Sequence, residues 1–261
     1  VVVGGLGSDS ITTLGEPSLG GLNQTISDIV LGDHGDLTFE VDGSVTAIAS
    51  SYSGIGGSDT IDTQIGLDMV LGGTADDVIT TGTDESGDLA RDIVLGDEGT
   101  ATFDSQGRID TIESTNTDIG GSDQITTGGG PDIVLAGADQ DTVLTESGDD
   151  LVLGDSGQVT FNSDLDAGVD AEHIGIVRTI NTITADVGDD DTITTDEGKD
   201  IVLGGAANDT VVTHLADESE GDIVIGDNGQ ITFEVDGSIK TIATTDSGIG
   251  GSDTIHTQNG A

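Results

Sequence analysis

The sequence predicts an all-β protein in which short strands stack as a parallel β-solenoid, and three observations lead to this prediction. Apolar residues gather in β-branched clusters such as Ile29-Val30-Leu31 and Ile201-Val202-Leu203, a composition typical of strands. Aspartate, followed two positions later by an aliphatic residue, recurs every nine residues. The chain has 43 glycines but only 4 phenylalanines, 1 tyrosine and no tryptophan, so one large central core is not expected.

The charge of the chain excludes several classes of partner. The 261 residues include 51 Asp plus Glu against 5 Lys plus Arg, a formal net charge of -46. Phosphate recognition needs clustered Lys and Arg, so no nucleic acid is expected as a partner. No apolar run approaches the ~20 residues of a membrane span, so no membrane insertion is expected either. High charge with few aromatics is also typical of disorder, but the regular β-branched clusters argue against it.

The repeating unit is nine residues long. Asp59, Asp68 and Asp77 are nine positions apart, and the run from Asp123 to Asp150 has the same step without interruption. An aliphatic residue two positions after each aspartate, such as Ile61, keeps this step. The unit is therefore expected to hold one short strand and one turn.

Longer repeats of ~64 residues are superimposed on the nine-residue unit. The string DIVLGD or a close variant begins at Asp28, Asp92, Asp150 and Asp222, at intervals of 64, 58 and 72 residues. Six units fill the first long repeat, an even number that preserves alternation between two facing sheets. We expect one continuous solenoid made of a partial repeat 1–27, repeat 1 at 28–91, repeat 2 at 92–149, repeat 3 at 150–221 with an inserted loop 162–175, and a partial repeat 222–261.

Four units depart from the pattern and allow two interpretations. They are centred on Phe39, Phe103, Phe161 and Phe233, and the aspartate of the unit is replaced there by Leu37, Ala101, Val159 and Ile231. Each can be a further coil of the solenoid. Each can also be a β-hairpin, since TFEVDGSV and TFEVDGSI place an Asp-Gly turn at Asp42-Gly43 and Asp236-Gly237. In both cases the phenylalanine is expected to fill a core.

Two complete units, Gly66 to Gly73 and Gly130 to Gly137, resemble the nonapeptide G-G-x-G-x-D-x-U-x of the RTX-type (haemolysin-type) calcium-binding β-roll repeat proteins. The resemblance implies a giant bacterial surface or secreted protein in which two consecutive units make one coil. It also implies that U points inward and that Gly-rich turns bind Ca²⁺ through backbone carbonyls and aspartate carboxylates.

The chemistry of Ca²⁺ agrees with this expectation, because the ion takes six to eight oxygen ligands and glycine lets a turn direct its carbonyls toward it. Without the ion, carboxylates stacked at the ~4.8 Å strand spacing would repel one another. The alternative is a solvated aspartate that stabilises its own turn. For Asp33, Asp97, Asp155 and Asp227, which replace a turn glycine, the two alternatives are equally open. The expected metal ligands are Asp9, Asp28, Asp59, Asp68, Asp77, Asp92, Asp123, Asp132, Asp141, Asp150, Asp191, Asp200, Asp209, Asp222 and Asp253.

We expect a calcium-stabilised structural or adhesive segment, such as a stalk, spacer or filament, of a tandem-repeat extracellular bacterial protein. No enzyme and no organic cofactor are expected, because no catalytic motif is present and the histidines (His34, His173, His214 and His256) occupy different repeat positions. The alternative is an ice-binding or surface-ligand-binding calcium β-solenoid, suggested by threonine pairs at Thr12-Thr13, Thr80-Thr81, Thr126-Thr127 and Thr194-Thr195.

The expected partners are calcium ions and neighbouring copies or covalent tandem repeats arranged end to end. Residues 28–67 and 222–261 are identical at 27 of 40 positions, which suggests a longer array. The absence of cysteine fits a secreted protein stabilised by metal, so the expected location is extracellular or at the cell surface.

Overall fold

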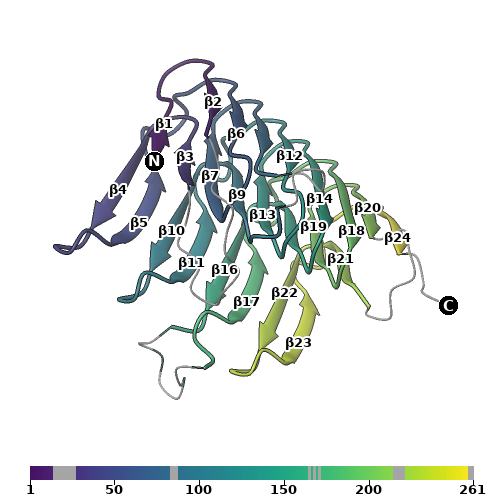
Figure 1. Ribbon diagram of the computed structural model, residues 1–261. Helices are drawn as coiled ribbons and strands as arrows, with labels where there is room; N and C mark the ends of the chain where they lie inside the picture. The colour runs from purple at the N-terminus through teal and green to yellow at the C-terminus, as the bar shows by residue number, and fades with distance from the viewer. Residues whose placement is uncertain are drawn as a thin grey trace.

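The computed structural model describes residues 1–13, 28–82, 88–163, 166, 169, 172–213 and 221–257, and these residues form strands and no helices (Figure 1). The strands make three sheets of eight strands each. Sheet A contains β1 (Val2–Val3), β3 (Asp28–Leu31), β7 (Asp68–Gly73), β9 (Ile93–Asp97), β13 (Ile133–Gly137), β15 (Leu151–Asp155), β19 (Ile201–Gly205) and β21 (Ile223–Asp227). Sheet B contains β2 (Ser10–Thr12), β6 (Thr60–Asp62), β8 (Val78–Thr80), β12 (Gln124–Thr126), β14 (Thr142–Ser147), β18 (Thr192–Glu197), β20 (Thr210–Thr213) and β24 (Thr254–Thr257). Sheet C contains β4 (Gly35–Phe39), β5 (Val45–Ser50), β10 (Gly99–Phe103), β11 (Ile109–Ser114), β16 (Gly157–Phe161), β17 (Val177–Thr182), β22 (Gly229–Phe233) and β23 (Ile239–Thr244).

Sheets A and B are parallel, and the nine-residue step carries the chain from one to the other. Ile61 lies in β6 of sheet B, Val70 in β7 of sheet A and Ile79 in β8 of sheet B. Equivalent residues pair directly, as in Val70 with Val94 and Ile61 with Ile79. The prediction of an all-β chain with stacked parallel strands is therefore confirmed for these two sheets.

Sheet C is antiparallel, so the prediction of a parallel arrangement is wrong for this part of the chain. Each Phe-centred unit forms a β-hairpin, and the four hairpins pair side by side along the molecule (Figure 1). In the first hairpin the N–H of Gly43 donates to the carbonyl of Glu40 at 3.0 Å, so the turn has Val41 and Asp42 at its centre, one residue earlier than the expected Asp42-Gly43, and Gly43 follows it with a positive φ. Such a short turn reverses the chain at once, so the next strand pairs antiparallel with the previous one. The hairpin alternative is correct, and Phe39 and Ile48 lie outside the two parallel sheets.

Two cores lie on opposite faces of sheet A. The central residue of each sheet A strand, such as Val70 or Val94, is fully buried against sheet B. The residues on either side of it, such as Ile93 and Leu95, are buried against the hairpins of sheet C, where Ile112 is fully buried. Sheet A is thus covered on both faces, which explains why its strands have three consecutive apolar residues instead of an alternating pattern.

The phenylalanines contribute to the core beneath sheet C to different extents. Phe161 is 3% exposed inside this core, and Phe103 and Phe233 pack against it while partly buried. Phe39 is 56% exposed, because it belongs to β4, the edge strand of sheet C. Six residues of the inserted loop 162–175 lie outside the described residues, and its described residue Asp166 forms an ion pair with Arg178 at 2.8 Å.

Candidate functional site

All fifteen aspartates expected to bind metal lie in two columns that run along the stacked strands. Ladder 1 lies at the start of the sheet B strands, and ladder 2 lies at the start of the sheet A strands. Ladder 1 consists of Asp9, Asp59, Asp77, Asp123, Asp141, Asp191, Asp209 and Asp253. Ladder 2 consists of Asp28, Asp68, Asp92, Asp132, Asp150, Asp200 and Asp222.

The same hydrogen bond connects successive rungs of both ladders. The backbone N–H of each aspartate donates to Oδ1 of the aspartate in the next rung, as Asp123 does to Asp141 at 2.8 Å and Asp132 to Asp150 at 2.9 Å. One carboxylate oxygen per rung is therefore used within the protein. The second oxygen, Oδ2, is the one available for another ligand.

These carboxylates are almost completely buried. The eleven inner aspartates of the two ladders are at most 2% exposed. Most ladder Oδ2 atoms are inaccessible to solvent and have no hydrogen-bond partner among the described residues. They belong to Asp9, Asp59, Asp77, Asp123, Asp141, Asp191 and Asp209 of ladder 1 and to Asp68, Asp92, Asp132 and Asp150 of ladder 2. A buried carboxylate oxygen without a donor destabilises the fold unless a proton or a cation neutralises it.

The pKa values of the inner ladder aspartates are raised, because burial and neighbouring carboxylates disfavour their charged form. Burial, followed by the charges of Asp123 and Asp191, raises the pKa of Asp141 to about 11. In ladder 2, burial and the charge of Asp132 raise the pKa of Asp92 to about 10. Because each carboxylate has like charges above and below it, the ladders cannot hold all their charges in the absence of a counterion.

Backbone carbonyls converge on the free oxygens of ladder 1. A methyl group added to Gly72 would lie 2.1 Å from the carbonyl oxygen of Gly96 and 2.5 Å from Oδ2 of Asp77. The same two kinds of oxygen meet at Gly204, where they come from Gly226 and Asp209. Glycine is thus required here to let carboxylate and carbonyl oxygens approach one another, and both are ligand types that Ca²⁺ prefers.

The donor set fits a hard cation that is held mainly by backbone oxygens. In the part of the chain that the structure describes, no three acidic or histidine side chains come together as a metal-ligand group. A cation in a ladder would therefore take at most two carboxylates, with carbonyl oxygens as its remaining protein ligands. Such a mixed set is ordinary for Ca²⁺ and unusual for Zn²⁺, which prefers imidazole and thiolate.

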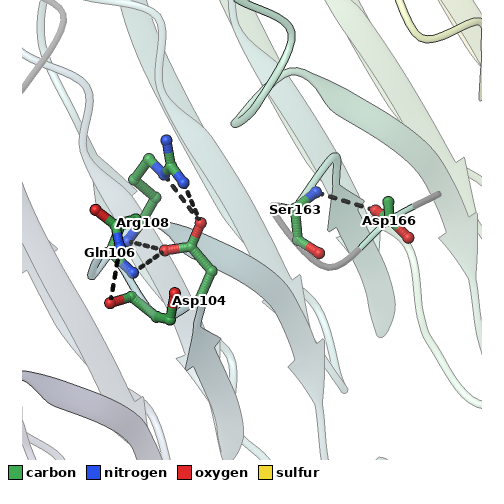
Figure 2. A network of polar contacts seen from close by, with 6 residues as sticks. Asp104, Gln106, Arg108, Ser163 and Asp166 are labelled. Atoms are coloured by element: carbon green, nitrogen blue, oxygen red, sulfur yellow. Dashed lines mark hydrogen bonds and ion pairs between the residues drawn. The ribbon is translucent and has the colours of Figure 1, made fainter. Parts of the chain in front are cut away.

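The ladder aspartates form no ion pair with a basic side chain among the described residues. The ion pairs among the described residues join Arg108 to Asp104, Arg178 to Asp166 and Lys240 to Glu234, and none of these acids belongs to a ladder. Asp104, shown in Figure 2, accepts hydrogen bonds from the backbone N–H of Gln106 and Arg108 and from the Arg108 guanidinium. Asp104 is fully satisfied by protein donors, whereas the ladder carboxylates are not.

A third column, formed by Asp33, Asp97, Asp155 and Asp227, anchors the hairpins of sheet C. Oδ1 of Asp97 accepts the N–H of Gly121 at 3.0 Å, and Oδ2 accepts the N–H of Ala138 at 2.5 Å. Asp33 likewise accepts the N–H groups of Gly57 and Thr74. These bonds favour the interpretation of Asp33 and Asp97 as turn-stabilising carboxylates over their interpretation as metal ligands.

Sequence reasoning missed a column of buried threonines beside ladder 2. Its members are fully buried and lie within the sheet B strands or directly after them: Thr63, Thr81, Thr127, Thr145, Thr195 and Thr213. Thr195 donates its hydroxyl to Oδ2 of Asp200 at 2.6 Å, and Thr213 donates to Oδ2 of Asp222 at 2.5 Å. The spacing Thr-x₄-Asp between Thr63 and Asp68, repeated at Thr127 and Asp132, is the sequence signal that could have revealed it.

The described histidines do not assemble into a site. The ring of His34 packs edge-on against Tyr52, with centroids 5.3 Å apart, and His256 is exposed on β24. His173 lies within the inserted loop 162–175, and His214 lies outside the described residues.

Comparisons with protein-family models, curated proteins and solved structures give no match to this chain. The described residues contain no helix long and apolar enough to cross a membrane.

Proposed function

We propose that this chain is a calcium-stabilised structural segment, a stalk, spacer or filament, of an extracellular bacterial protein built from tandem repeats. The proposal includes the finer fold assignment, a β-roll in which sheets A and B are the two walls of one coil. It is supported by the nonapeptides, which resemble those of the RTX-type calcium-binding β-roll proteins in composition and spacing. Its hairpin sheet C is an addition to that pattern.

The observation that carries the proposal is the pair of aspartate ladders with buried, unpartnered Oδ2 atoms. Adjacent charges at the ~4.8 Å strand spacing repel by roughly 3 kcal/mol at an effective dielectric constant of about 20. Calcium entering between rungs replaces this repulsion with attraction and makes folding depend on the ion. Extracellular media are rich in Ca²⁺, so such a segment folds after export.

The edges of the three sheets support a role in extended assemblies. Ile242 of β23 is 51% exposed, whereas its counterparts Ile48, Ile112 and Ile180 in the other hairpins are fully buried. β23 is the edge strand of sheet C, and β21 and β24 are the edges of sheets A and B at the same end (Figure 1). A further repeat, in the same chain or in another copy, would pair with these strands and cover Ile242.

Electron microscopy of native material, combined with calcium analysis, tests this proposal. We expect thin fibres or stalks with an axial repeat that matches one or more long repeats, and with bound calcium in the washed material. Isolated, blunt particles of one segment's length without calcium would contradict it.

A second candidate function, binding to ice or to another regular hydroxylated surface, is favoured by a threonine rank on sheet C. Direct cross-strand pairing aligns one residue from each of the eight strands, and seven of the eight are threonine. The rank runs Thr38, Ala47, Thr102, Thr111, Thr160, Thr179, Thr232 and Thr241. Hydroxyls of neighbouring threonines bond to one another, at 2.6 Å between Thr160 and Thr179.

The rank differs from the one expected from the sequence. On sheet B the outward row through Thr12, Thr80 and Thr126 is interrupted by Asp62 and Leu144, and the second threonine of three pairs is buried.

Replacement of Thr160 and Thr179 by Val removes two central hydroxyls of the rank and keeps the shape of the side chains. If this surface binds ice, the variant should enter growing ice less than the wild type does, while the same change at Thr142 on sheet B should have no effect. Equal incorporation of all three proteins would contradict the second candidate.

A further inference from the structure

Sheet B has one face packed against sheet A and one face turned outward. Its strands alternate, so Ile61, Ile79 and Ile125 point into the core shared with sheet A, and the residue on either side of each points away from it. Direct pairing aligns these outward residues in two rows along the eight strands. Row 1 runs from Ser10 to Thr254, and row 2 runs from Thr12 to His256.

The outward face of sheet B is almost free of charge. Asp62 is the one acid in the two rows, and neither row contains lysine or arginine, although 21% of the residues in the chain are charged. Val78 is 40% exposed, and Leu144 and Val212 belong to neither core. Parallel sheets are normally covered on both faces, as sheet A is. An uncharged parallel face that carries aliphatic side chains is suited to contact with another surface.

The composition of the face restricts the partner. Neither row contains Phe, Tyr or Trp, so flat rings such as bases find no stacking platform. A second copy of this chain presents the same ~4.8 Å strand spacing and the same lack of charge. Two chains of net charge -46 repel one another elsewhere, and even the outward face of sheet C includes Asp36 and Glu113 beside its threonine rank. The face of sheet B is therefore where two copies can approach most closely.

One arrangement of two copies also places an acid opposite a histidine. In a twofold dimer whose axis runs along β14, between the two faces, the strand order of one copy is reversed in the other. β6 then faces β24 of the second copy, β8 faces β20, and β12 faces β18. Asp62 of β6 and His256 of β24 both lie in row 2, so the Asp62 carboxylate faces an imidazole whose ring N–H can donate to it. The pair forms twice, because a twofold interface is self-complementary.

The centre of this arrangement is apolar. Leu144 lies in β14, on the axis, and meets its own counterpart in the second copy. It is the largest aliphatic side chain of the two rows, and the residues that contribute most to an interface cluster near its centre.

We infer that the outward face of sheet B binds the same face of a second copy of this chain, with the two copies side by side and running in opposite directions. This contact goes beyond the proposed stalk or filament, because it joins chains laterally and not end to end. It depends on the fold and on the uncharged face, and no ladder aspartate takes part in it.

The size of the contact predicts a weak dimer. Seven of the eight sheet B strands of each copy overlap in this arrangement. At ~4.8 Å per strand and ~10–13 Å across the two rows, the dimer buries on the order of 1,000 Å² in total, near the lower limit of specific interfaces. Repulsion between charges more than ~8 Å apart is largely screened at physiological ionic strength. A longer array, with more strands in the face, should associate more tightly.

Cysteine cross-linking tests the contact on the full chain, which has no cysteine of its own. Facing sheets lie ~10 Å apart, beyond the reach of a direct disulfide, so the probe is a bismaleimide with a short spacer, added in the presence of CaCl₂. We expect Leu144→Cys to give cross-linked dimers and the matched control Thr111→Cys, on the outward face of sheet C, to give none. No dimer from Leu144→Cys, or equal yields from both variants, would overturn the inference.

A mixture of two variants tests the direction of the copies. Asp62→Cys mixed with His256→Cys should give dimers that contain one chain of each, because β6 of one copy faces β24 of the other. Asp62→Cys alone should not cross-link, since its two copies lie six strand spacings apart, ~29 Å. Cross-linking of Asp62→Cys with itself would overturn the proposed arrangement.

Sedimentation equilibrium covers the case in which a cysteine variant does not fold. In CaCl₂ the wild type and Thr111→Glu should change from monomer to dimer as their concentration rises, whereas Leu144→Glu should stay monomeric, with circular dichroism as the check of folding. A wild type that stays monomeric would overturn the inference. Equal assembly of all three chains into filaments would also overturn it and would leave the proposed end-to-end role in place. A wild type that dimerises through Leu144 and binds no calcium would contradict the proposed function alone.

Discussion

Removal of calcium at neutral pH should unfold this chain, and acid should restore its fold without the ion. The perturbation is dialysis against excess EGTA at pH 7.5, followed by transfer of the metal-free protein to pH values from 4.5 to 9. The groups concerned are thirteen buried aspartates whose pKa values are raised from 3.8 to between about 6 and about 11. Burial is the first cause in every case.

The magnitude follows from the linkage between pKa and stability. One pKa unit corresponds to about 1.4 kcal/mol, so a shift of a single unit on each of thirteen groups already amounts to roughly 18 kcal/mol. The whole free energy of unfolding of a natural domain is about 5–15 kcal/mol. The metal-free chain therefore cannot keep these carboxylates ionised and remain folded.

The direction of the pH effect is fixed by the sign of the shifts. A carboxyl whose pKa is higher in the folded state binds more protons there than in the unfolded state, so its stabilising contribution is complete below pH 3.8. That contribution is lost as the pH rises through the folded-state values, from about 6 upward. Far-UV circular dichroism of the metal-free chain should show strong β signal near pH 4.5 and a progressive loss between about pH 6 and pH 9.

Two controls separate the ladders from the general surface charge. Millimolar CaCl₂ at pH 8 should restore the β signal, whereas NaCl of equal ionic strength, which only screens exposed charges, should not. A metal-free chain with the same β signal and the same Tm at pH 4.5 and pH 8 would refute the reasoning.

Three further predictions concern ion selectivity and packing. Mg²⁺ should restore the fold poorly at concentrations where Ca²⁺ restores it fully, because Mg²⁺ demands near-octahedral geometry and dehydrates reluctantly; equal recovery in a circular dichroism titration would contradict this. Ile112→Ala should lower the free energy of unfolding in calcium by about 2–5 kcal/mol in urea denaturation, since Ile112 is fully buried between sheets A and C, while Val41→Ala at an exposed hairpin turn should change it little. Gly120→Ala should lower Tm, because the new methyl would lie 2.0 Å from Oδ2 of Asp97, whereas Gly248→Ala, with no atom within 4 Å, should not; similar Tm values for both would show that Asp97 does not anchor its hairpin tightly.

Much of the fold was predictable because its periods are local. The nine-residue step of aspartate and aliphatic residue appears wherever one strand and one turn are repeated, and equivalent positions such as Val70 and Val94 pair directly in sheet A. The stacking of the fifteen ladder aspartates in columns follows from the same step, because residues at equal positions in stacked units must lie above one another. Burial of Ile93 and Leu95 could also have been read from the three consecutive apolar residues, which are typical of a strand covered on both faces.

The hairpins could not be assigned from the sequence alone, because a Phe-centred unit has the length of a coil and the turn residues of a hairpin. Pairing between hairpins that are distant in sequence decided the question, as Ala47 of β5 pairs with Thr102 of β10. This pairing gives the isolated hairpins a common sheet and covers the outer face of sheet A. The threonine rank on sheet C results from the same register, and no local pattern around Thr160 or Thr179 reveals it.

The sequence by itself determined that this protein is all-β, acidic and built from nine-residue units whose aspartates stack in columns. The tertiary structure alone decided that most of these aspartates are buried and which of them find a donor for their second oxygen. The physical reason is that an aspartate's position depends on the period of the chain, whereas the partner of its second oxygen depends on which sheet lies beside it. Next to the sheet B strands, the hydroxyls of Thr195 and Thr213 donate to the last two rungs of ladder 2, whereas the second oxygens of its inner rungs Asp68 to Asp150 have no such donor. In the turns that lead from sheet A to sheet B, the neighbours are carbonyl oxygens and the free Oδ2 atoms of residues such as Asp209, where we propose that calcium binds.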